Sequence, residues 1–471
     1  MKLKLSITLL ILFTSWVCYG QISNPRHPAE WEEISSVIME FRYFKKPNES
    51  WDKALDPFIK TAKACIEEKI NFYIIKPTEN SKYSHQMDLD SIFKNKNISS
   101  PFVHIISKDT ISGSYPWTRD HGMNFVYKND VEKGYLYNFF EDYTGNFIAE
   151  QFNYPSAIIT PENNNDYYTD GGNFLTDGHG TFNIAATDIT EDLPTSLKLK
   201  YDYFYQYFGI QKTLNVLVPF VHVDYFLKLI NEETAIISYI PNNNYDISID
   251  EYYDHQYYID QAAISISQYL KSAFGRELKL IPIQNAPTTY DKKTETVLHT
   301  SKATYTNSLI LNKTVLVPQY SIEPFDSLAI NTYKKVMPGY KIVGVNCRLY
   351  GQFSGAIHCL THEIYANNPI YIKHKWYQDI VKNNLNGFPI SIVSKSPSGI
   401  KKAILFWKTS QTMPYKSLQM KNVKNDIFEA IIPTANSGIT ISYYIQVQNN
   451  NGKTIQKPMV APKYSYRFTV E

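Results

Sequence analysis

The sequence predicts a large α/β domain followed by a small all-β domain. Its 471 residues are too many for one ordinary domain and suit one large and one small domain. In the first part, short apolar runs typical of strands alternate with helical patterns, as in residues 55–70 followed by residues 71–75. After residue 386 the pattern changes to strands alone. We therefore predict an α/β domain over residues 21–380 and a β domain over residues 387–471.

The first twenty residues have the pattern of a signal peptide. Lys2 and Lys4 precede an apolar run from Leu5 to Val17, and the small residue Gly20 marks a plausible cleavage point. The apolar run is too short to cross a membrane as a helix. We therefore expect the mature protein to be secreted, periplasmic or attached to the cell surface, with no membrane span.

The composition indicates a folded protein without the charge of a nucleic-acid binder. Apolar residues make up 43% of the chain and charged residues only 20%, which favours a packed core over disorder. Lys and Arg number 47 against 45 Asp and Glu, so the formal net charge is +2. Because neither a basic excess nor a basic cluster is present, we expect no nucleic-acid partner.

The C-terminal pattern predicts a small β-sandwich. Apolar and polar residues alternate from Ile441 to Gln448, as in a half-buried strand, and Asn451-Gly452 follows as a hairpin turn. Further strands are expected at residues 404–407, 427–432 and 466–470. Short strands with regular turns over about 85 residues favour an immunoglobulin-like sandwich, and we find no catalytic cluster in it.

An odd number of cysteines remains once the signal peptide is removed. These are Cys65, Cys347 and Cys359, so at least one thiol stays free or pairs with another molecule. Cys65 lies in a helical apolar pattern and Cys347 follows a strand-like run, and both patterns are typical of buried structural cysteines. Cys359 differs because it follows a loop of small residues that starts at Gly355.

Four short stretches concentrate polar groups among apolar neighbours. Each alone has an ordinary explanation: a surface ion pair, a turn, a hydrogen-bonded core histidine and a structural cysteine. Together they supply a thiol, a histidine and several carboxylates, which suit nucleophilic attack on a positively charged carbon. The stretches are Trp117-Thr118-Arg119-Asp120, Asp170-Gly171-Gly172-Asn173, His222-Val223-Asp224 and Gly355-Ala356-Ile357-His358-Cys359.

A guanidinium group fits this set of residues. It is flat, permanently charged and rich in N–H donors, which carboxylates such as Asp120 and Asp224 can accept in pairs. A thiolate is the effective nucleophile, and a nearby protonated histidine would lower the pKa of the cysteine. The same histidine could protonate departing ammonia and then activate water.

In this order the motifs resemble those of the agmatine deiminase and bacterial peptidylarginine deiminase family, within the guanidino-modifying superfamily. The resemblance spans residues 28–364 and adds an N-terminal signature, Pro28-Ala29-Glu30-Trp31-Glu32. The Tyr305-Thr306-Asn307 stretch supplies the family's active-site asparagine. The fold that the resemblance implies is an α/β propeller of five ββαβ-type blades around a central site.

The resemblance also implies a role for each site residue. Cys359 would be the nucleophile that forms a covalent amidino (thiouronium) intermediate, and His222 would be the general acid and base. Asp120 and Asp224 would hold the guanidinium nitrogens. Asn307 would position the nucleophile or the substrate.

Two further positions carry substrate-binding roles by resemblance. Trp117 would pack against the aliphatic stem of the substrate. Asp170 would orient His222, although the commoner family residue there is Glu, which has a longer side chain.

Other polar residues are expected to be structural. His358 would point away from the site if the backbone is extended there, and His179 lies in a turn pattern. His362-Glu363 lacks a second histidine four residues on, as zinc sites of that type require, and no calcium loop of the EF-hand type is present. We therefore expect catalysis without a metal or organic cofactor.

The substrate is less well defined by the sequence. No Arg lies between His121 and Asp170 to bind the carboxylate of free or C-terminal arginine, so either another segment binds that carboxylate or the enzyme accepts internal arginines. Glu141 and Asp142 could receive the distal ammonium of agmatine. We expect a secreted deiminase that converts peptide or protein arginine to citrulline. Agmatine deiminase, an amidinotransferase and a non-catalytic binding protein remain alternatives, and the oligomeric state is open.

Overall fold

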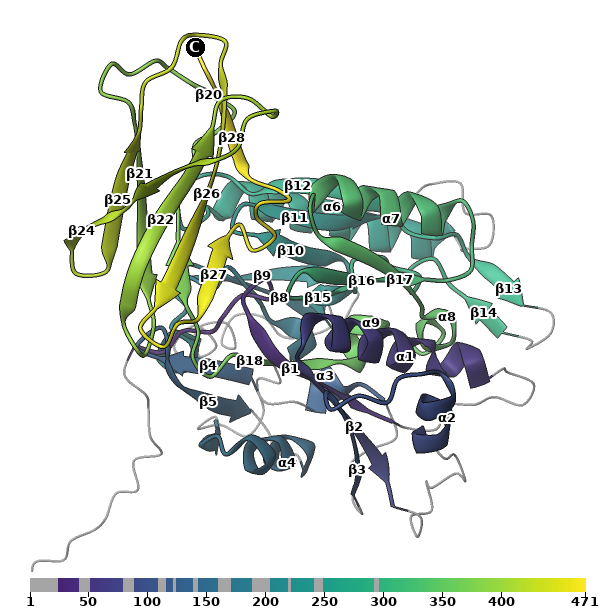
Figure 1. Ribbon diagram of the computed structural model, residues 1–471. Coiled ribbons are helices and arrows are strands. Elements are labelled where there is room, and N and C mark those ends of the chain that lie inside the picture. The colour runs from purple at the N-terminus through teal and green to yellow at the C-terminus, as the bar shows by residue number, and fades with distance from the viewer. Residues whose placement is uncertain are drawn as a thin grey trace, which may run out of the picture.

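The computed structural model describes residues 24–41, 51–78, 89–108, 116–121, 124–138, 143–159, 171–188, 204–218, 222–240, 249–291 and 296–471. It shows a mixed α/β part and, at one end of it, a part built of strands alone (Figure 1). The predicted signal peptide and the site residue Asp170 lie outside the described residues. Within them, no helix is both long and apolar enough to cross a membrane.

Five small sheets of the α/β part share one pairing pattern. In each, two antiparallel strands are followed by a third strand that runs parallel to the second. The first sheet has the order β18(His362–Tyr365)-β1(Ile34–Glu40)-β2(Asn71–Pro77)-β3(Val103–Lys108). The others are β4(Asn124–Lys128)-β5(Glu132–Asn138)-β6(Ser156–Ile158), β7(Leu175–Thr176)-β8(Asn183–Asp188)-β9(Thr213–Val218), β10(Leu227–Asn231)-β11(Thr234–Tyr239)-β12(Lys279–Gln284) and β15(Leu309–Leu311)-β16(Thr314–Gln319)-β17(Lys341–Asn346).

Amphipathic helices connect the parallel strands of these sheets. α1(Trp51–Glu68), α4(Tyr143–Phe152), α6(Ile249–Tyr269) and α7(Phe325–Val336) each lie between the second and third strand of a unit. The α/β part also contains the short helices α2(Leu89–Asn95), α3(Thr118–His121), α8(Arg348–Gly351) and α9(Ile357–Leu360), the 3₁₀ helices η1(Gly171–Asn173) and η2(Val223–Tyr225), and a hairpin of β13(Thr289–Asp291) and β14(Thr296–Leu298). The expected α/β class is confirmed, and the arrangement of the sheets as a propeller stays a prediction.

The first and last strands of the α/β part lie side by side. β1 pairs antiparallel with β18, with Val37 opposite Glu363 and Ile38 opposite His362. This pairing brings the N-terminal segment before β1 close to the short helix α9(Ile357–Leu360) that precedes β18. β1 and β18 consist almost entirely of buried residues.

Two sheets form the C-terminal part around one apolar core. Their orders are β19(Tyr371–Lys373)-β21(Phe388–Lys395)-β25(Ile427–Ile432)-β24(Lys421–Lys424) and β20(Ile380–Val381)-β28(Tyr466–Val470)-β26(Thr440–Asn449)-β22(Ile400–Lys408)-β23(Lys416–Gln419), with β27(Thr454–Lys457) also on β26. The predicted domain start at residue 387 therefore falls inside these sheets, because β19 and β20 already pair with later strands. The immunoglobulin-like topology stays a prediction.

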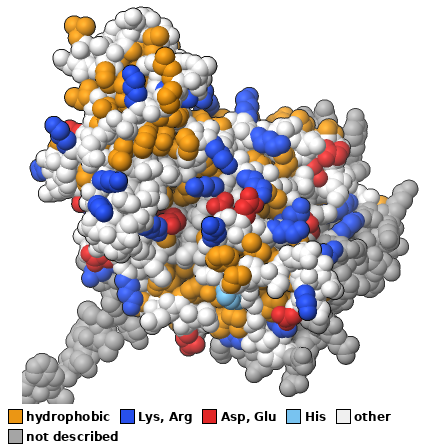
Figure 2. All heavy atoms as spheres, in the orientation of Figure 1, with side chains coloured by type: hydrophobic (Ala, Val, Ile, Leu, Met, Phe, Trp, Pro, Cys, Tyr) orange, Lys and Arg blue, Asp and Glu red, His pale blue; other side chains and the backbone are white. Residues whose placement is uncertain are grey.

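Ion pairs join the C-terminal part to the α/β part. Lys457 lies 2.5 Å from Glu232, whose side chain is 3% exposed, and His179 faces the same carboxylate. Burial alone would raise the pKa of Glu232, but Lys457 and His179 lower it below its usual value. Lys395 with Asp130 and Lys453 with Glu33 form two further pairs, and Figure 2 shows basic and acidic side chains along this border.

We predict that Lys457→Met destabilises the protein by about 3 kcal/mol, because it leaves the Glu232 carboxylate buried and largely uncompensated. Urea denaturation at pH 7 measures the effect. Lys421→Met is the matched control, since Lys421 is exposed on β24 and its loss removes no buried charge partner. Equal stability of the two variants would contradict a structural role for the Lys457–Glu232 pair.

Candidate active site

The predicted site residues lie on short helices and loops next to the ends of the strands. Cys359 is on α9, and Trp117 and Asp120 belong to the stretch around α3(Thr118–His121). His222 and Asp224 flank the start of the 3₁₀ helix η2(Val223–Tyr225). Cys359, Asp224 and Asn307 meet directly, and Asp120 faces His222.

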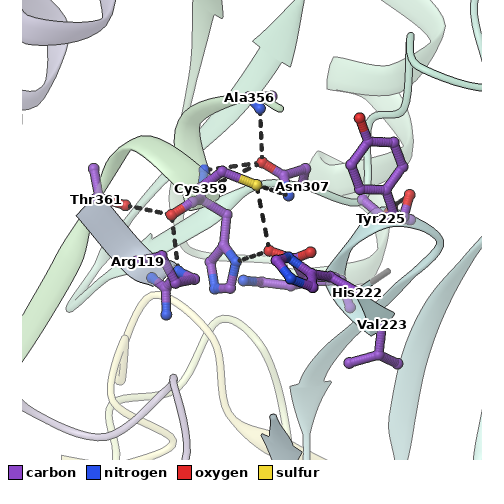
Figure 3. A network of polar contacts seen from close by, with 12 residues as sticks. Arg119, His222, Val223, Tyr225, Asn307, Ala356, Cys359 and Thr361 are labelled. Carbon is purple, nitrogen blue, oxygen red and sulfur yellow. Dashed lines mark hydrogen bonds and ion pairs between the residues drawn. The ribbon is translucent and has the colours of Figure 1, made fainter. Parts of the chain in front are cut away.

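Asn307 contacts both the thiol of Cys359 and the backbone around it. Its amide nitrogen donates a hydrogen bond to Cys359 Sγ at 3.1 Å (Figure 3). Its Oδ1 accepts from the backbone N–H groups of Ala356, His358 and Cys359 at 3.1, 3.2 and 3.3 Å. The first N–H groups of a helix lack partners within the helix, so this distant side chain supplies the acceptor that α9 needs. Asn307 therefore fixes the position of the Cys359 thiol, and its catalytic role stays a prediction.

Asp224 is the deepest carboxylate beside the sulfur. Its Oδ2 lies 3.6 Å from Cys359 Sγ and 2.7 Å from His358 Nδ1. Its Oδ1 is buried and has no hydrogen-bond partner among the residues that the structure describes. A buried acceptor without a donor is costly, so this oxygen is suited to receive an N–H group from a bound ligand.

Asp120 and His222 form a more open side of the site. His222 Nδ1 lies 3.8 Å from Asp120 Oδ1, and the two side chains are 13% and 24% exposed. A Cβ atom at position 172 would come within 2.5 Å of His222 Nδ1, so Gly172 is what allows the histidine to sit there. Asp170 lies outside the described residues, so its predicted role in orienting His222 stays a prediction. Among the described residues, the carboxylate of Asp120 lies next to His222.

Trp117 packs on the loop that precedes Cys359. A Cβ atom at position 355 would come within 2.5 Å of its ring, so the indole lies flush against Gly355. The side chain is 9% exposed, which leaves only an edge available to a ligand. The tryptophan therefore shapes the loop before Cys359, and contact with a substrate stem stays a prediction.

The charges of the site favour a neutral thiol and an ionised aspartate. Burial raises the pKa of Cys359 well above its usual value, and the Asp224 and Asp120 carboxylates raise it further. Burial alone would raise the pKa of Asp224, but His358, His222 and Arg119 lower it below its usual value. In the free protein the pKa of the thiol therefore moves in the opposite direction to the lowering expected from a nearby histidine, chiefly because the thiol is buried and further because two carboxylates lie beside it.

His358 does not point away from the site. The expectation assumed an extended backbone, but residues 357–360 form the helix α9, which turns the imidazole onto Asp224. Its second nitrogen, Nε2, lies 3.0 Å from Glu30 Oε1. His179, by contrast, lies in a turn as expected, and its Nδ1 is 2.6 Å from the Tyr371 hydroxyl.

A buried ionic network supports the site from behind. Arg119 donates to the backbone oxygen of His358 at 2.8 Å and pairs with Glu363 at 2.5 Å, so it is not the surface ion pair that its neighbour Asp120 suggested. Lys228, which is fully buried, donates to Glu30. The N-terminal signature Pro28-Ala29-Glu30-Trp31-Glu32 singled out Glu30 in the sequence. Lys228 is a single charged residue in an apolar run, and nothing in the sequence indicated that it contacts the site.

No group of three or more His, Cys, Asp or Glu side chains among the described residues is arranged to hold a metal ion. The described cysteines Cys65, Cys347 and Cys359 are all free and buried. The polar groups around Cys359 can thus bind a cation and present a sulfur atom to it.

The proteins that this chain resembles in sequence are named as deiminases of guanidino compounds. A family model described as Porphyromonas-type peptidyl-arginine deiminase matches residues 26–364. A protein of Legionella pneumophila named putative agmatine deiminase is 23% identical over 356 residues, which cover 71% of this chain and 93% of that protein.

Solved structures share the fold of the α/β part. The agmatine deiminase of Enterococcus faecalis aligns with a TM-score of 0.56 at 20% identity, covering 74% of this chain and 99% of that one. A putative arginine deiminase from Porphyromonas gingivalis aligns with a TM-score of 0.55 at 17% identity, covering 73% of this chain and 96% of that one.

We predict that Asp224→Asn makes Cys359 react faster with iodoacetamide at pH 8 in the absence of substrate. Removing a carboxylate that raises the thiol pKa lowers that pKa and increases the thiolate fraction. Mass spectrometry of the peptide that contains Cys359 measures the rate, and Cys359→Ala gives the background from Cys65 and Cys347. A slower reaction in Asp224→Asn would mean that the carboxylate instead activates the thiol as a base.

Proposed function

Because the chain belongs to the family of Porphyromonas-type peptidyl-arginine deiminases, we propose that it hydrolyses the guanidinium group of arginine residues in peptides or proteins, forming citrulline and ammonia. One observation carries the proposal. Asp224 presents a buried, unpartnered oxygen next to the sulfur of Cys359. A guanidinium bound there would satisfy that oxygen and place its central carbon within reach of the sulfur.

The substrate cation itself helps to form the nucleophile. In the free protein the thiol is neutral, because burial and two carboxylates disfavour the thiolate. A bound guanidinium pairs with Asp120 and Asp224 and places a positive charge beside the sulfur, which favours the thiolate. The thiol proton passes to His222, which then stands as the imidazolium next to Asp120.

The first half of the reaction forms a covalent thiouronium intermediate on Cys359. The thiolate of Cys359 adds to the guanidinium carbon and gives a tetrahedral adduct. His222 donates its proton to one terminal nitrogen, the C–N bond breaks and ammonia leaves. The carbon then remains bonded to sulfur as a thiouronium, which keeps its positive charge between Asp120 and Asp224.

The second half restores the enzyme. His222, now neutral, accepts a proton from water, and the resulting hydroxide adds to the thiouronium carbon. The C–S bond breaks and the electron pair returns to Cys359, while the proton of the added hydroxyl passes to the released ammonia and a ureido group leaves. His222 then returns its proton to the Cys359 thiolate. The balance is one guanidinium and one water converted to one ureido group and one ammonium ion.

Agmatine is the second candidate substrate. It is favoured by the curated relatives, since the Legionella pneumophila protein of that name is covered over 93% of its length. The chemistry at Cys359 is the same for both substrates. They differ in the group beyond the aliphatic stem, and Glu141 and Asp142, which could receive an ammonium there, lie outside the described residues.

Two features of the whole chain complete the proposal. The five repeated sheets support a propeller with the site at its centre, because residues from several units meet at Cys359. Lys2, Lys4 and the apolar run after them support removal of residues 1–20 during secretion. The C-terminal strands, which the family model does not cover, would then be an accessory domain of a secreted enzyme, and an immunoglobulin-like topology fits their two sheets.

We predict that the protein releases ammonia from benzoyl-arginine amide and that Cys359→Ala lowers the rate by at least about 10³-fold, because the nucleophile is lost. Cys65→Ala is the matched control, since it removes a different buried thiol, from α1, and should retain activity. Competition of agmatine against an internal-arginine peptide in one assay, with both products measured by mass spectrometry, assigns the substrate. Ammonia release from agmatine alone would replace the peptide proposal with the second candidate.

A further inference from the structure

The imidazole of His358 lies between the buried carboxylate of Asp224 and the partly exposed carboxylate of Glu30. Its Nδ1 is 2.7 Å from Asp224 Oδ2 and its Nε2 is 3.0 Å from Glu30 Oε1. The side chains of His358 and Asp224 are each 1% exposed and that of Glu30 is 14% exposed, so water does not compete for the contact with Asp224. A carboxylate can only accept hydrogen bonds, and a ring nitrogen donates only when it carries a proton. Both contacts are therefore hydrogen bonds only if His358 is an imidazolium.

The surrounding charges agree with this protonation state. Three carboxylates face one another across the buried network, those of Asp224, Glu30 and Glu363. Lys228 is bonded to Glu30 and Arg119 to Glu363, which provides two cations. An imidazolium at His358 is the third cation and balances the network, whereas a neutral ring would leave one buried negative charge without compensation.

The contact with His358 also fixes how Asp224 presents its oxygens. With Oδ2 bonded to Nδ1, the other oxygen, Oδ1, stays free for a ligand. Rotation of the carboxylate would break the bond to His358 and move the vacant acceptor. The ring itself is anchored on the far side by Glu30, which Lys228 holds in turn.

We propose that His358 is a positioning residue which, as an imidazolium held between Glu30 and Asp224, orients the Asp224 carboxylate toward the substrate guanidinium. The inference rests on the proposed function for its catalytic consequence, but the protonation state can be measured without turnover. Glu30 and Lys228 extend the positioning chain to the N-terminal segment and to β10.

Two substitutions of His358 test its hydrogen bonds to Asp224 and to Glu30 one at a time. His358→Asn keeps a donor at the place of Nδ1, toward Asp224, and His358→Gln keeps one at the place of Nε2, toward Glu30. We expect kcat/KM to fall by less than 10-fold in His358→Asn and by about 100-fold in His358→Gln, with a raised KM, because only the second releases Asp224. Thermal unfolding of both variants checks that they fold alike.

A role limited to stability predicts a different outcome. Each variant removes one buried hydrogen bond, so a purely structural histidine would give similar losses of activity in both. Equal losses, or a larger loss in His358→Asn, would overturn the positioning role.

Nitrogen-15 NMR of histidine-labelled protein tests the protonation state directly. The His358 ring signals are assigned by their absence in His358→Asn, and at pH 7.5 we expect both nitrogens to carry protons. One unprotonated nitrogen would overturn the imidazolium. If the wild-type protein released no ammonia from either substrate, the proposed function would fail, while this measurement would still decide the state of His358.

Discussion

A carboxylate buried beside a sulfur atom is the constraint around which the rest of the α/β part is arranged. Asp224 has no access to bulk water, and an isolated charge in that position would be very unfavourable. The structure compensates it with hydrogen bonds and with the cations of the network behind it. These contacts leave one oxygen, Asp224 Oδ1, without a hydrogen-bond partner among the described residues. Asp224 therefore stays ionised and can still accept a hydrogen bond from a bound cation.

This arrangement explains why each motif is weak evidence by itself. Asn307 and Cys359 are 52 residues apart and Asp224 and Cys359 are 135 apart, yet all three side chains touch. Each sits in a short connection at the end of a different sheet, where the local pattern is that of an ordinary turn or helix start. Only the joint geometry has chemical meaning, because a thiol becomes useful when a bound cation offsets its two acidic neighbours.

The sequence was sufficient to predict the α/β class, the strand-rich C-terminal part and the meeting of Cys359, Asp224 and Asn307. It could not predict the direction of the His358 side chain. Residues 357–360 are too few for their apolar periodicity to distinguish a helix from a strand. Lys228 in an apolar strand also gave no sign of its partner, since Glu30 is distant in the chain and adjacent only in the fold. The predicted start of the β domain at residue 387 lies after β19 and β20, which belong to its sheets. These two strands are too short to show a periodicity of their own.

The pairing of β1 with β18 has a consequence for how the protein comes into being. Glu30 lies just before the first strand, whereas His358 and Cys359 lie just before the last one, more than 320 positions later. A ribosome must therefore synthesise nearly the whole α/β part before Cys359 and His358 can meet their partners. Contacts at such long sequence separation form late and slowly. A nascent or prematurely terminated chain would thus have no functional centre, so that reactivity arises only with the completed architecture.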